Sequence, residues 1–240
     1  MSVRSSIKDG VARVHLDSPA TRNSLSKDLS DALAEAVRSV QNEAGALVLT
    51  AEPPVFCAGG NLDDLIEPKG PLASTYAGFL ALAACPIPTI AVVDGAAIGA
   101  GVNLPLACDI VIAGPKARFD PRWLDVGIHP GGGHLQRLER RVGRQGAAAL
   151  VLCGDALTGQ DAAAAGLAWR YDEDPLALAL KFATRAAGRD HELVVRTKQT
   201  LDTETDDPVA LELEAQQWSM NRSGFTDGVR RIKESLRKPR

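Results

Sequence analysis

Two clusters of small residues, each placed where an apolar segment gives way to a helix, constrain this chain most. Residues 88–93 are largely apolar, and GAAIGAGVNLPLACDI follows at 95–110. The second cluster, VFCAGGNL at 55–62, follows the apolar segment ALVLT at 46–50. Small side chains allow close approach to the backbone, and the first amides of a helix carry partial positive charge. The chain must therefore alternate strands with helices and leave backbone amides open to a ligand.

The hydrophobic pattern predicts an α/β fold. We expect strands at residues 11–16, 46–50, 88–93 and 109–113, and helices at 26–41, 72–84, 141–152, 159–165 and 176–187. Residues 191–240 contain two further helical stretches, with a break near 206–208. We therefore expect a core over residues 1–190 and a helical region over 191–240 that is suited to self-association.

Net charge, apolar content and cysteine spacing exclude several classes of protein. The 240 residues carry a net charge of −3, so neither nucleic acid nor an anionic membrane is an expected partner. No segment is long and apolar enough to span a membrane, and the first residues lack the apolar stretch of a signal peptide. The four cysteines are far apart and form no CxxC pair, which indicates neither a metal site nor disulfides. We expect a cytoplasmic protein.

The glycine pattern does not fit a nucleotide-binding loop. Gly99 and Gly101 are followed by Leu104 where a dinucleotide fingerprint has its third glycine, and no Gly-Lys-Ser/Thr motif is present. Two backbone amides that converge on one oxygen would instead form an oxyanion hole, which stabilises charge on a carbonyl oxygen. Both small-residue junctions together favour this interpretation over simple packing.

Four segments in this order carry a resemblance. They are VFCAGGNLDDL at 55–65, PTIAVVDGAAIGAGVNLPLACDIVIA at 88–113, ARFDPRWLDVGIHPGGGHLQRLERRVG at 117–143 and LTGQDAAAAGLAWR at 157–170. The chain resembles the crotonase superfamily of enoyl-CoA hydratases and isomerases. The resemblance implies a spiral of ββα units and a helical C-terminal region that assembles trimers or hexamers. It also implies an acyl-CoA thioester as ligand, with coenzyme A entering as part of the substrate and no separate cofactor.

The resemblance assigns thioester-oxygen binding to the amides of Gly60 and Ala100. It places the CoA moiety along Ala58, Gly60, Asn61, Leu62 and Asp63, and it places Arg22 near the CoA phosphates. A guanidinium suits phosphate, although Arg22 could equally be a solvated residue at the start of a helix. A further Phe–Lys contact of the family aligns here with Ile232 and Ser235, so Lys233 or Arg237 would have to substitute.

Both acid/base positions of the family differ in this chain. The two glutamates that hold a water in the hydratases correspond to Asn103 and Trp123. A carboxamide cannot accept a proton near neutral pH, and an indole N–H can only donate. A tryptophan at this place also occurs in the chlorobenzoyl-CoA dehalogenases, but their nucleophilic Asp corresponds to the glycines at 131–133.

Other titratable groups near these motifs are candidate substitutes. They are Asp125, Asp120, His129, His134, Asp63 and Asp64, and for each a role in a turn, a cap or packing is the alternative. Two functions therefore remain open. The first is an enzyme of the hydratase/isomerase type with a non-standard acid/base group, and the second is an acyl-CoA-binding protein that has lost catalysis.

Overall fold

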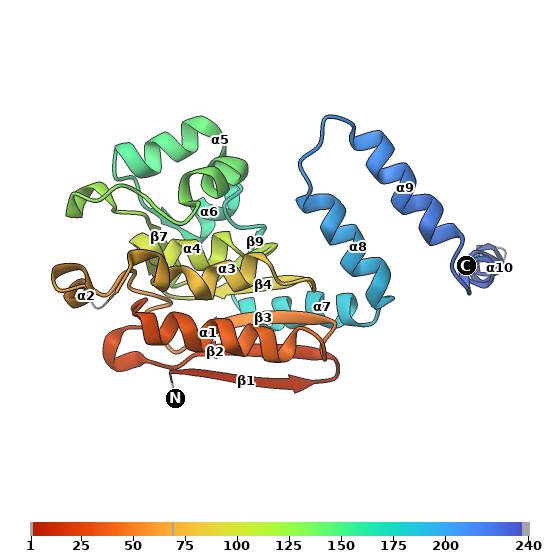
Figure 1. The fold of residues 1–240 in the computed structure, drawn as a ribbon, viewed down its shortest axis with the longest axis horizontal. Helices are drawn as coiled ribbons and strands as arrows, with labels where there is room; N and C mark the ends of the chain where they lie inside the picture. The colour runs from red at the N-terminus through yellow and green to blue at the C-terminus, as the bar shows by residue number, and fades with distance from the viewer. Residues whose placement is uncertain (1, 69, 237–240) are drawn as a thin grey trace. The chain divides into compact units, whose positions relative to one another are not determined.

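The computed structural model describes residues 2–68 and 70–236, and the chain divides into two units, residues 1–189 and 190–240 (Figure 1). A six-stranded sheet organises the first unit. In order across the sheet, its strands are β1 (Val3–Lys8), β2 (Val11–Leu16), β3 (Ala46–Ala51), β4 (Thr89–Val93), β6 (Ile110–Ala113) and β9 (Arg170–Tyr171). The β1–β2 pair is antiparallel and every other pair is parallel.

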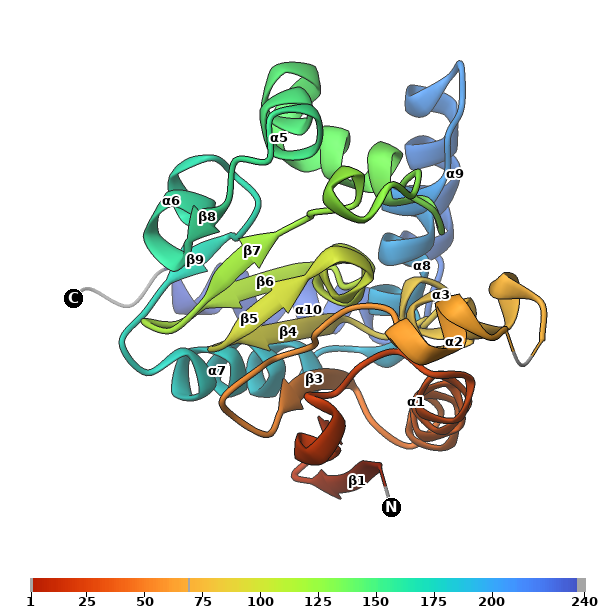
Figure 2. The same cartoon turned by 90° about the vertical axis from the view of Figure 1, so that its left-hand side faces the viewer.

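Helices cover both faces of this sheet. On one face lie α1 (Lys27–Val40), α3 (Ala77–Ala83) and α4 (Asn103–Leu106), and α7 (Pro175–Ala187) packs on the other (Figure 2). Leu47 and Leu49 of β3 belong to the first core, whereas Ala46 and Val48 belong to the core under α7. Because successive side chains of a strand point to opposite faces, a strand covered on both faces must be apolar throughout. This explains why ALVLT has no polar alternation.

A second, three-stranded sheet carries the glycine-rich junction at 95–101. Its order is β5 (Ala96–Ile98), β7 (Arg118–Asp120) and β8 (Leu157–Thr158). The remaining elements of the unit are η1 (Pro19–Thr21), α2 (Leu62–Ile66), η2 (Leu72–Tyr76), η3 (Gly99–Val102), η4 (Leu124–Val126), α5 (His134–Leu152) and α6 (Gly159–Ala164), where η denotes a 3-10 turn. Because η3 runs directly into α4, residues 99–106 form one continuous helical segment.

Helix ends differ from the sequence pattern where capping or glycine decides them. Ser26 caps α1, its Oγ accepting from the Leu29 amide at 3.2 Å, so the helix begins one residue later than expected. The expected helix at 141–152 covers the C-terminal part of α5 and spans its kink at Gly143, where φ is 70°, but α5 already begins at His134. The periodicity of the C-terminal part was visible in the sequence, but the glycine concealed its continuity with the N-terminal part.

The second unit contains α8 (His191–Asp202), α9 (Pro208–Met220) and α10 (Phe225–Ser235). The expectation of two helical stretches was wrong among the described residues, because α9 ends at Met220 and a third helix follows Gly224, its N-cap, whose φ is 88°. The guanidinium groups of Arg196 and Arg222 each lie over the Trp218 ring, 4.8 Å from its centre. Within the described ranges, no helix combines the length and apolar character that membrane crossing demands.

Candidate functional site

The two glycine-rich junctions lie side by side. The Cys57 amide donates to the Ala96 carbonyl at 3.1 Å, and the Ile98 amide donates to the Cys57 carbonyl at 2.9 Å. Cys57 and Ala97 thereby form an isolated parallel β-bridge, so the segment at 55–62 pairs with β5 at this one position. Segments about forty residues apart in the sequence are thus held at hydrogen-bonding distance.

Glycines make this approach possible. A Cβ atom on Gly59, whose φ is +92°, would lie 2.5 Å from the Ile98 carbonyl oxygen and 3.4 Å from the Ala100 nitrogen. A Cβ atom on Gly101 would lie 2.4 Å from the Cys57 carbonyl oxygen. Either contact is shorter than van der Waals packing permits, so a larger residue at either position would force the junctions apart.

The amides of Gly60 and Ala100 are available in this arrangement. Ala100 lies in the first turn of η3, where amides have no acceptor within the helix. Among the described residues, the Gly60 amide has no hydrogen-bond acceptor in the protein. Gly59, which precedes Gly60, brings its Cα beside Ala100, so the two donors belong to one small region of the molecule.

The residues expected along CoA form a contiguous strip of backbone. The Ala58 amide donates to the Arg22 carbonyl at 3.0 Å, and the Asn61 amide donates to the Leu25 carbonyl at 3.3 Å. Arg22 is exposed and has a left-handed backbone, with φ of 53°. Asn61 caps α2 by accepting from the Asp64 amide at 3.1 Å, which commits its side-chain oxygen to the helix.

Leu62 and Asp63 are exposed in the first turn of α2, next to this strip. A cavity of about 290 Å³ borders Gly60 and Asn61 and is also lined by Leu65 and by residues of the 68–75 segment. The cavity also touches Leu25 and Lys27, but none of its lining residues belongs to the segments at 99–103 or 121–134. The cavity therefore adjoins the Gly60 side of the candidate oxyanion site and not the Ala100 side.

Asn103 and Trp123, which the resemblance predicts at the positions of the family glutamates, come together around a third residue. His134 Nδ1 lies 2.8 Å from the Asn103 Oδ1, and the Trp123 and His134 rings meet edge to face with centres 5.3 Å apart. All three side chains are buried, with exposed fractions of 0%, 8% and 1% for Asn103, Trp123 and His134. None of the three is a carboxylate.

The hydrogen bonds of Asn103 define the protonation of His134. Asn103 Nδ2 donates to the Gly131 carbonyl at 3.2 Å, which leaves Oδ1 as the acceptor toward His134. Nδ1 of His134 therefore carries the proton, and Nε2 carries the free lone pair. Burial, reinforced by the nearby Arg137 charge, lowers the pKa of His134 to about 4. The imidazole is consequently neutral around pH 7.

Two ring nitrogens of this cluster are left without partners. Trp123 Nε1 and His134 Nε2 are buried and have no hydrogen-bond partner among the described residues. Leaving a buried polar group unsatisfied costs roughly 1–3 kcal/mol. The cluster thus combines a satisfied Asn103–His134 pair with one unused donor and one unused acceptor.

The other candidate acid/base groups lie elsewhere. Asp125 is exposed, and so is His129, whose Nδ1 lies 2.7 Å from the Pro130 carbonyl oxygen. Asp120 is buried, which favours its neutral form, but hydrogen bonds from Arg122 and Arg118 hold its pKa below the ordinary value. Asp120 is therefore a charged anchor for two arginines and not a proton donor at neutral pH.

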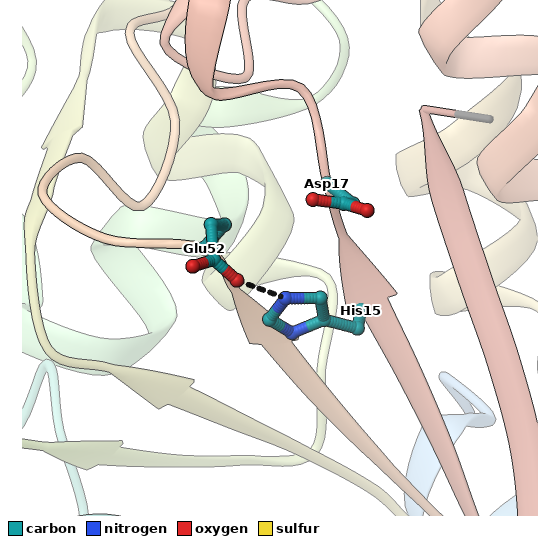
Figure 3. A group of neighbouring side chains, drawn as sticks. All are labelled: His15, Asp17 and Glu52. Atoms are coloured by element: carbon teal, nitrogen blue, oxygen red, sulfur yellow. Dashed lines mark hydrogen bonds and ion pairs between the residues drawn. The ribbon is translucent and has the colours of Figure 1, made fainter.

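One cluster of possible metal ligands lies at the ends of β2 and β3. His15, Asp17 and Glu52 each place a ligand atom within 4.8 Å of the others (Figure 3). His15 Nε2 is 3.0 Å from Glu52 Oε2 and its Nδ1 is 2.8 Å from Thr50 Oγ1. Arg4 pairs with Asp17 at 2.9 Å and approaches Glu52 at 3.7 Å. These side chains already satisfy one another as an ion-pair network, so the geometry gives no reason to assign a metal.

Comparison with known proteins identifies the family to which the chain belongs. The profile of the enoyl-CoA hydratase/isomerase family matches residues 6–237. The chain belongs to the enoyl-CoA hydratase/isomerase family. It is 38% identical over 218 residues to a probable enoyl-CoA hydratase, EchA14, of Mycobacterium tuberculosis, which covers 87% of this chain and 84% of the relative. It is 36% identical to the 2,3-dehydroadipyl-CoA hydratase of Escherichia coli, which covers 72% of this chain and 69% of the relative.

Solved structures of enoyl-CoA hydratases share the fold. A putative enoyl-CoA hydratase from Streptomyces coelicolor superposes with a TM-score of 0.88 at 29% identity, covering all of this chain and 93% of that one. A putative enoyl-CoA hydratase/carnithine racemase from Magnetospirillum magneticum gives 0.89 at 27% identity, covering 99% and 97%. The expected crotonase-type α/β fold is confirmed.

The sequence offers His134 as one of several candidate acid/base residues, and nothing in its neighbours distinguishes it from His129. In the structure His134 follows the glycines of 131–133 and begins α5, so its ring reaches Asn103.

The residues expected to make a further CoA contact lie in the second unit. Ile232 and Lys233 are exposed on α10, the side chain of Ser235 is not described, and Arg237 lies outside the described residues.

Proposed function

We propose that this protein binds an acyl-CoA thioester and stabilises negative charge on the thioester oxygen with the Gly60 and Ala100 amides. The observation that carries the proposal is the pairing of the two junctions, which places Gly59 against Ile98 and Ala100. Backbone donors fixed in advance are effective because they need no reorganisation as charge develops. The CoA moiety would follow Arg22, Ala58, Asn61, Leu62 and Asp63.

The reaction best supported is one that depends mainly on enolate stabilisation. Asn103 and Trp123 stand where hydration would require proton-transferring carboxylates, and each lost acid/base group costs about 10²–10⁴ in rate. Isomerisation or decarboxylation of a thioester needs fewer such groups than hydration. We therefore propose an acyl-CoA enzyme of the hydratase/isomerase type in which hydration by the two-glutamate route is inefficient.

A specific observation favours a second candidate, a non-catalytic acyl-CoA-binding protein. Among the described residues, the Asn103–Trp123–His134 cluster contains no carboxylate, and the expected substitutes Asp125 and His129 are exposed. A protein of this kind would retain the amide donors and lose proton transfer. Turnover distinguishes the two candidates, because binding is common to both.

We further propose a cytoplasmic homotrimer or a hexamer built from trimers. Free cysteines, three of them buried, fit a reducing compartment. Exposed apolar side chains on the helices of the second unit, such as Val209 and Val229, support self-association through that unit.

The test combines calorimetry with turnover. The purified protein would be titrated with butyryl-CoA and incubated with crotonyl-CoA, a β,γ-enoyl-CoA and a malonyl-type thioester. We expect micromolar binding and turnover of a β,γ-enoyl or malonyl-type thioester. Binding without any turnover would select the non-catalytic candidate, and hydration of crotonyl-CoA at ordinary enzyme rates would contradict our reading of Asn103 and Trp123.

A proline substitution tests the backbone donor itself. Ala100→Pro removes one amide in the first turn of a helical segment, where proline is tolerated. Turnover should fall by about 10²–10³, as for the loss of one oxyanion-hole donor. Gln160→Pro at the second residue of α6, exposed and away from the site, is the matched control. Equal turnover by Ala100→Pro and Gln160→Pro would exclude the Ala100 amide from catalysis.

A further inference from the structure

We propose that Ser30 is a positioning residue for the acyl chain of the thioester, because its hydroxyl fixes one wall of the cavity beside Gly60. This inference rests on the proposed function, which places the thioester oxygen at the Gly60 amide. Ser30 is not among the residues that line the cavity. It acts through the main chain of η2 and α3, to which its hydroxyl is bonded.

Ser30 is a polar residue on the buried face of α1. Its exposed fraction is 0%, and it shares this face with apolar residues such as Leu33 and Val37. A serine inside a helix can bond its hydroxyl to the carbonyl four residues earlier. The Ser30 hydroxyl instead donates to the Thr75 carbonyl at 2.7 Å, in a segment 45 residues away. Since an alanine would fit the apolar pattern of this face, the contact with that segment is what the hydroxyl adds.

The same hydroxyl completes the junction between η2 and α3. The Gly78 amide donates to Ser30 Oγ at 2.9 Å. Gly78 is the second residue of α3, where an amide has no acceptor within the helix, and Tyr76 at the N-cap makes no side-chain hydrogen bond. Ser30 therefore caps α3 from a neighbouring helix. One oxygen thus holds the amide of Gly78 and the carbonyl of Thr75 against α1.

Gly78 also allows α3 to lie close to α1, and the two helices pack side by side (Figure 2). A Cβ atom on Gly78 would lie 2.9 Å from Leu33 Cδ2 and 3.1 Å from the Ser30 carbonyl oxygen. A larger residue would therefore push α3 away from α1. The junction is held by hydrogen bonds and by close packing at the same place.

The segment that Ser30 holds is part of the cavity wall. Leu72, Ser74 and Thr75 of η2 line the cavity of about 290 Å³ that borders Gly60. Leu65 also lines it, and its Cδ1 would lie 3.7 Å from a Cβ atom on Gly60. The apolar lining thus begins beside the amide proposed for the thioester oxygen and continues to the residues fixed by Ser30.

The lining of the cavity suits a hydrocarbon chain. The hydroxyls of Ser74 and Thr75 donate to main-chain carbonyls of their own segment at 2.7 and 2.8 Å, and Lys27 pairs with Asp31. These polar side chains are therefore already engaged, and the acyl chain needs no hydrogen bonds. A methylene group takes about the volume of a water molecule, roughly 30 Å³, so the cavity has room for up to about nine carbons.

The test compares a short and a long acyl chain. Calorimetry at pH 7 would measure the affinities of butyryl-CoA and octanoyl-CoA for the wild type and for Ser30→Ala. Octanoyl-CoA should bind the wild type about tenfold or more tightly, because its longer chain contacts more of the wall. In Ser30→Ala the η2–α3 junction loses its fixed position. The ratio of the two affinities should then fall by about fourfold for each methylene group that loses its contacts.

Three further substitutions test whether the hydroxyl acts through the junction. Gly78→Ala displaces α3 and leaves the hydroxyl in place, so it should lower the ratio as Ser30→Ala does. Ser30→Thr retains a hydroxyl and should restore most of the wild-type ratio. Ser39→Ala is the matched control, because Ser39 is exposed on the same helix and donates to the Ala36 carbonyl of that helix at 2.9 Å. This control should keep the wild-type ratio.

The wild-type affinities separate the inference from the proposed function. Equal affinities for butyryl-CoA and octanoyl-CoA would show that the cavity does not hold the chain, and they would leave the proposed function intact. Absence of binding to either thioester would overturn the proposed function itself.

The variants decide the role of Ser30. A Ser30→Ala protein that unfolds at lower urea concentration but keeps the wild-type ratio would reduce the hydroxyl to a structural role, and the inference would fail. A fall in the ratio for Ser39→Ala as large as that for Ser30→Ala would also overturn it. Circular dichroism identifies any variant that does not fold. If Ser30→Ala is one, Gly78→Ala and Ser30→Cys, which keeps the volume and weakens the hydrogen bonds, decide in its place.

Discussion

Asn103 changes the site by orienting a neighbour. Its amide is held by the Gly131 carbonyl and presents an oxygen to His134, so it selects one tautomer of the imidazole. A glutamate at this position would instead carry charge and exchange protons. An amide at this position therefore provides a fixed pattern of donors and acceptors instead of proton transfer, and this pattern depends on His134.

The burial of His134 predicts a pH-dependent stability. Its pKa of about 4 lies below the unfolded value of 6.5, so the unfolded chain binds more protons between these values. The native state should therefore lose stability as pH falls from about 6.5 toward 4. Between pH 7 and pH 5 this amounts to about 2 kcal/mol. Urea unfolding at both pH values should show this loss in the wild type and not in His134→Asn, and an identical pH dependence in both proteins would refute the assignment.

The junctions at 55–62 and 95–102 work as one element. Neither has more than a bridge or a three-residue strand, yet backbone hydrogen bonds and two close glycine contacts join them. A helix start alone would offer amides from one segment only. The pairing brings the Gly60 and Ala100 amides, from two segments, into one region through backbone hydrogen bonds.

Gly101→Ala tests the close approach. The added Cβ would meet the Cys57 carbonyl oxygen at 2.4 Å, and backbone cannot move away as a flexible side chain would. We expect a loss of about 1–3 kcal/mol in the free energy of unfolding, as for other overpacked sites, together with weaker acyl-CoA binding. Gly188→Ala is the matched control, because its nearest contact is an ordinary 3.5 Å and its φ is −78°. A native-like Gly101→Ala would show that the junctions can separate without consequence.

At the scale of the molecule, the two units differ in how they bury apolar surface. The first has two cores, one on each face of its main sheet. In the second unit, α10 exposes Phe225, Val229 and Ile232, which recur along one side of the helix. An amphipathic helix with its apolar residues exposed is suited to association with other chains.

Val229→Glu tests the proposed assembly. Burial of a charge at a subunit interface is unfavourable, so the variant should dissociate toward smaller species in sedimentation velocity. The wild type should sediment as a trimer or hexamer, and Arg231→Glu, an exposed charged position on the same helix, should sediment like the wild type. A monomeric wild type, or no effect of Val229→Glu, would contradict assembly through α10.

Local sequence was sufficient for much of the fold. Apolar runs such as ALVLT identified buried strands, because a strand covered on both faces has no polar alternation. The spacing of its apolar residues identified α1, and the structure adds that Ser26 caps its start. The short strands β5, β7, β8 and β9 were not foreseen, since two or three residues carry no periodic signal and their pairing depends on distant segments.

The sequence by itself determined the family and the α/β architecture, because motifs of contiguous residues carry this information, and it predicts that Asn103 and Trp123 replace both family glutamates. Only the tertiary structure decided which distant residues meet. It joined Cys57 to the residues around Ala97, and it chose His134 over His129 as the neighbour of Asn103. The physical reason is that contact, burial and tautomer depend on how α4, η4 and α5 pack, and a histidine carries no local mark of the side chain that it will face.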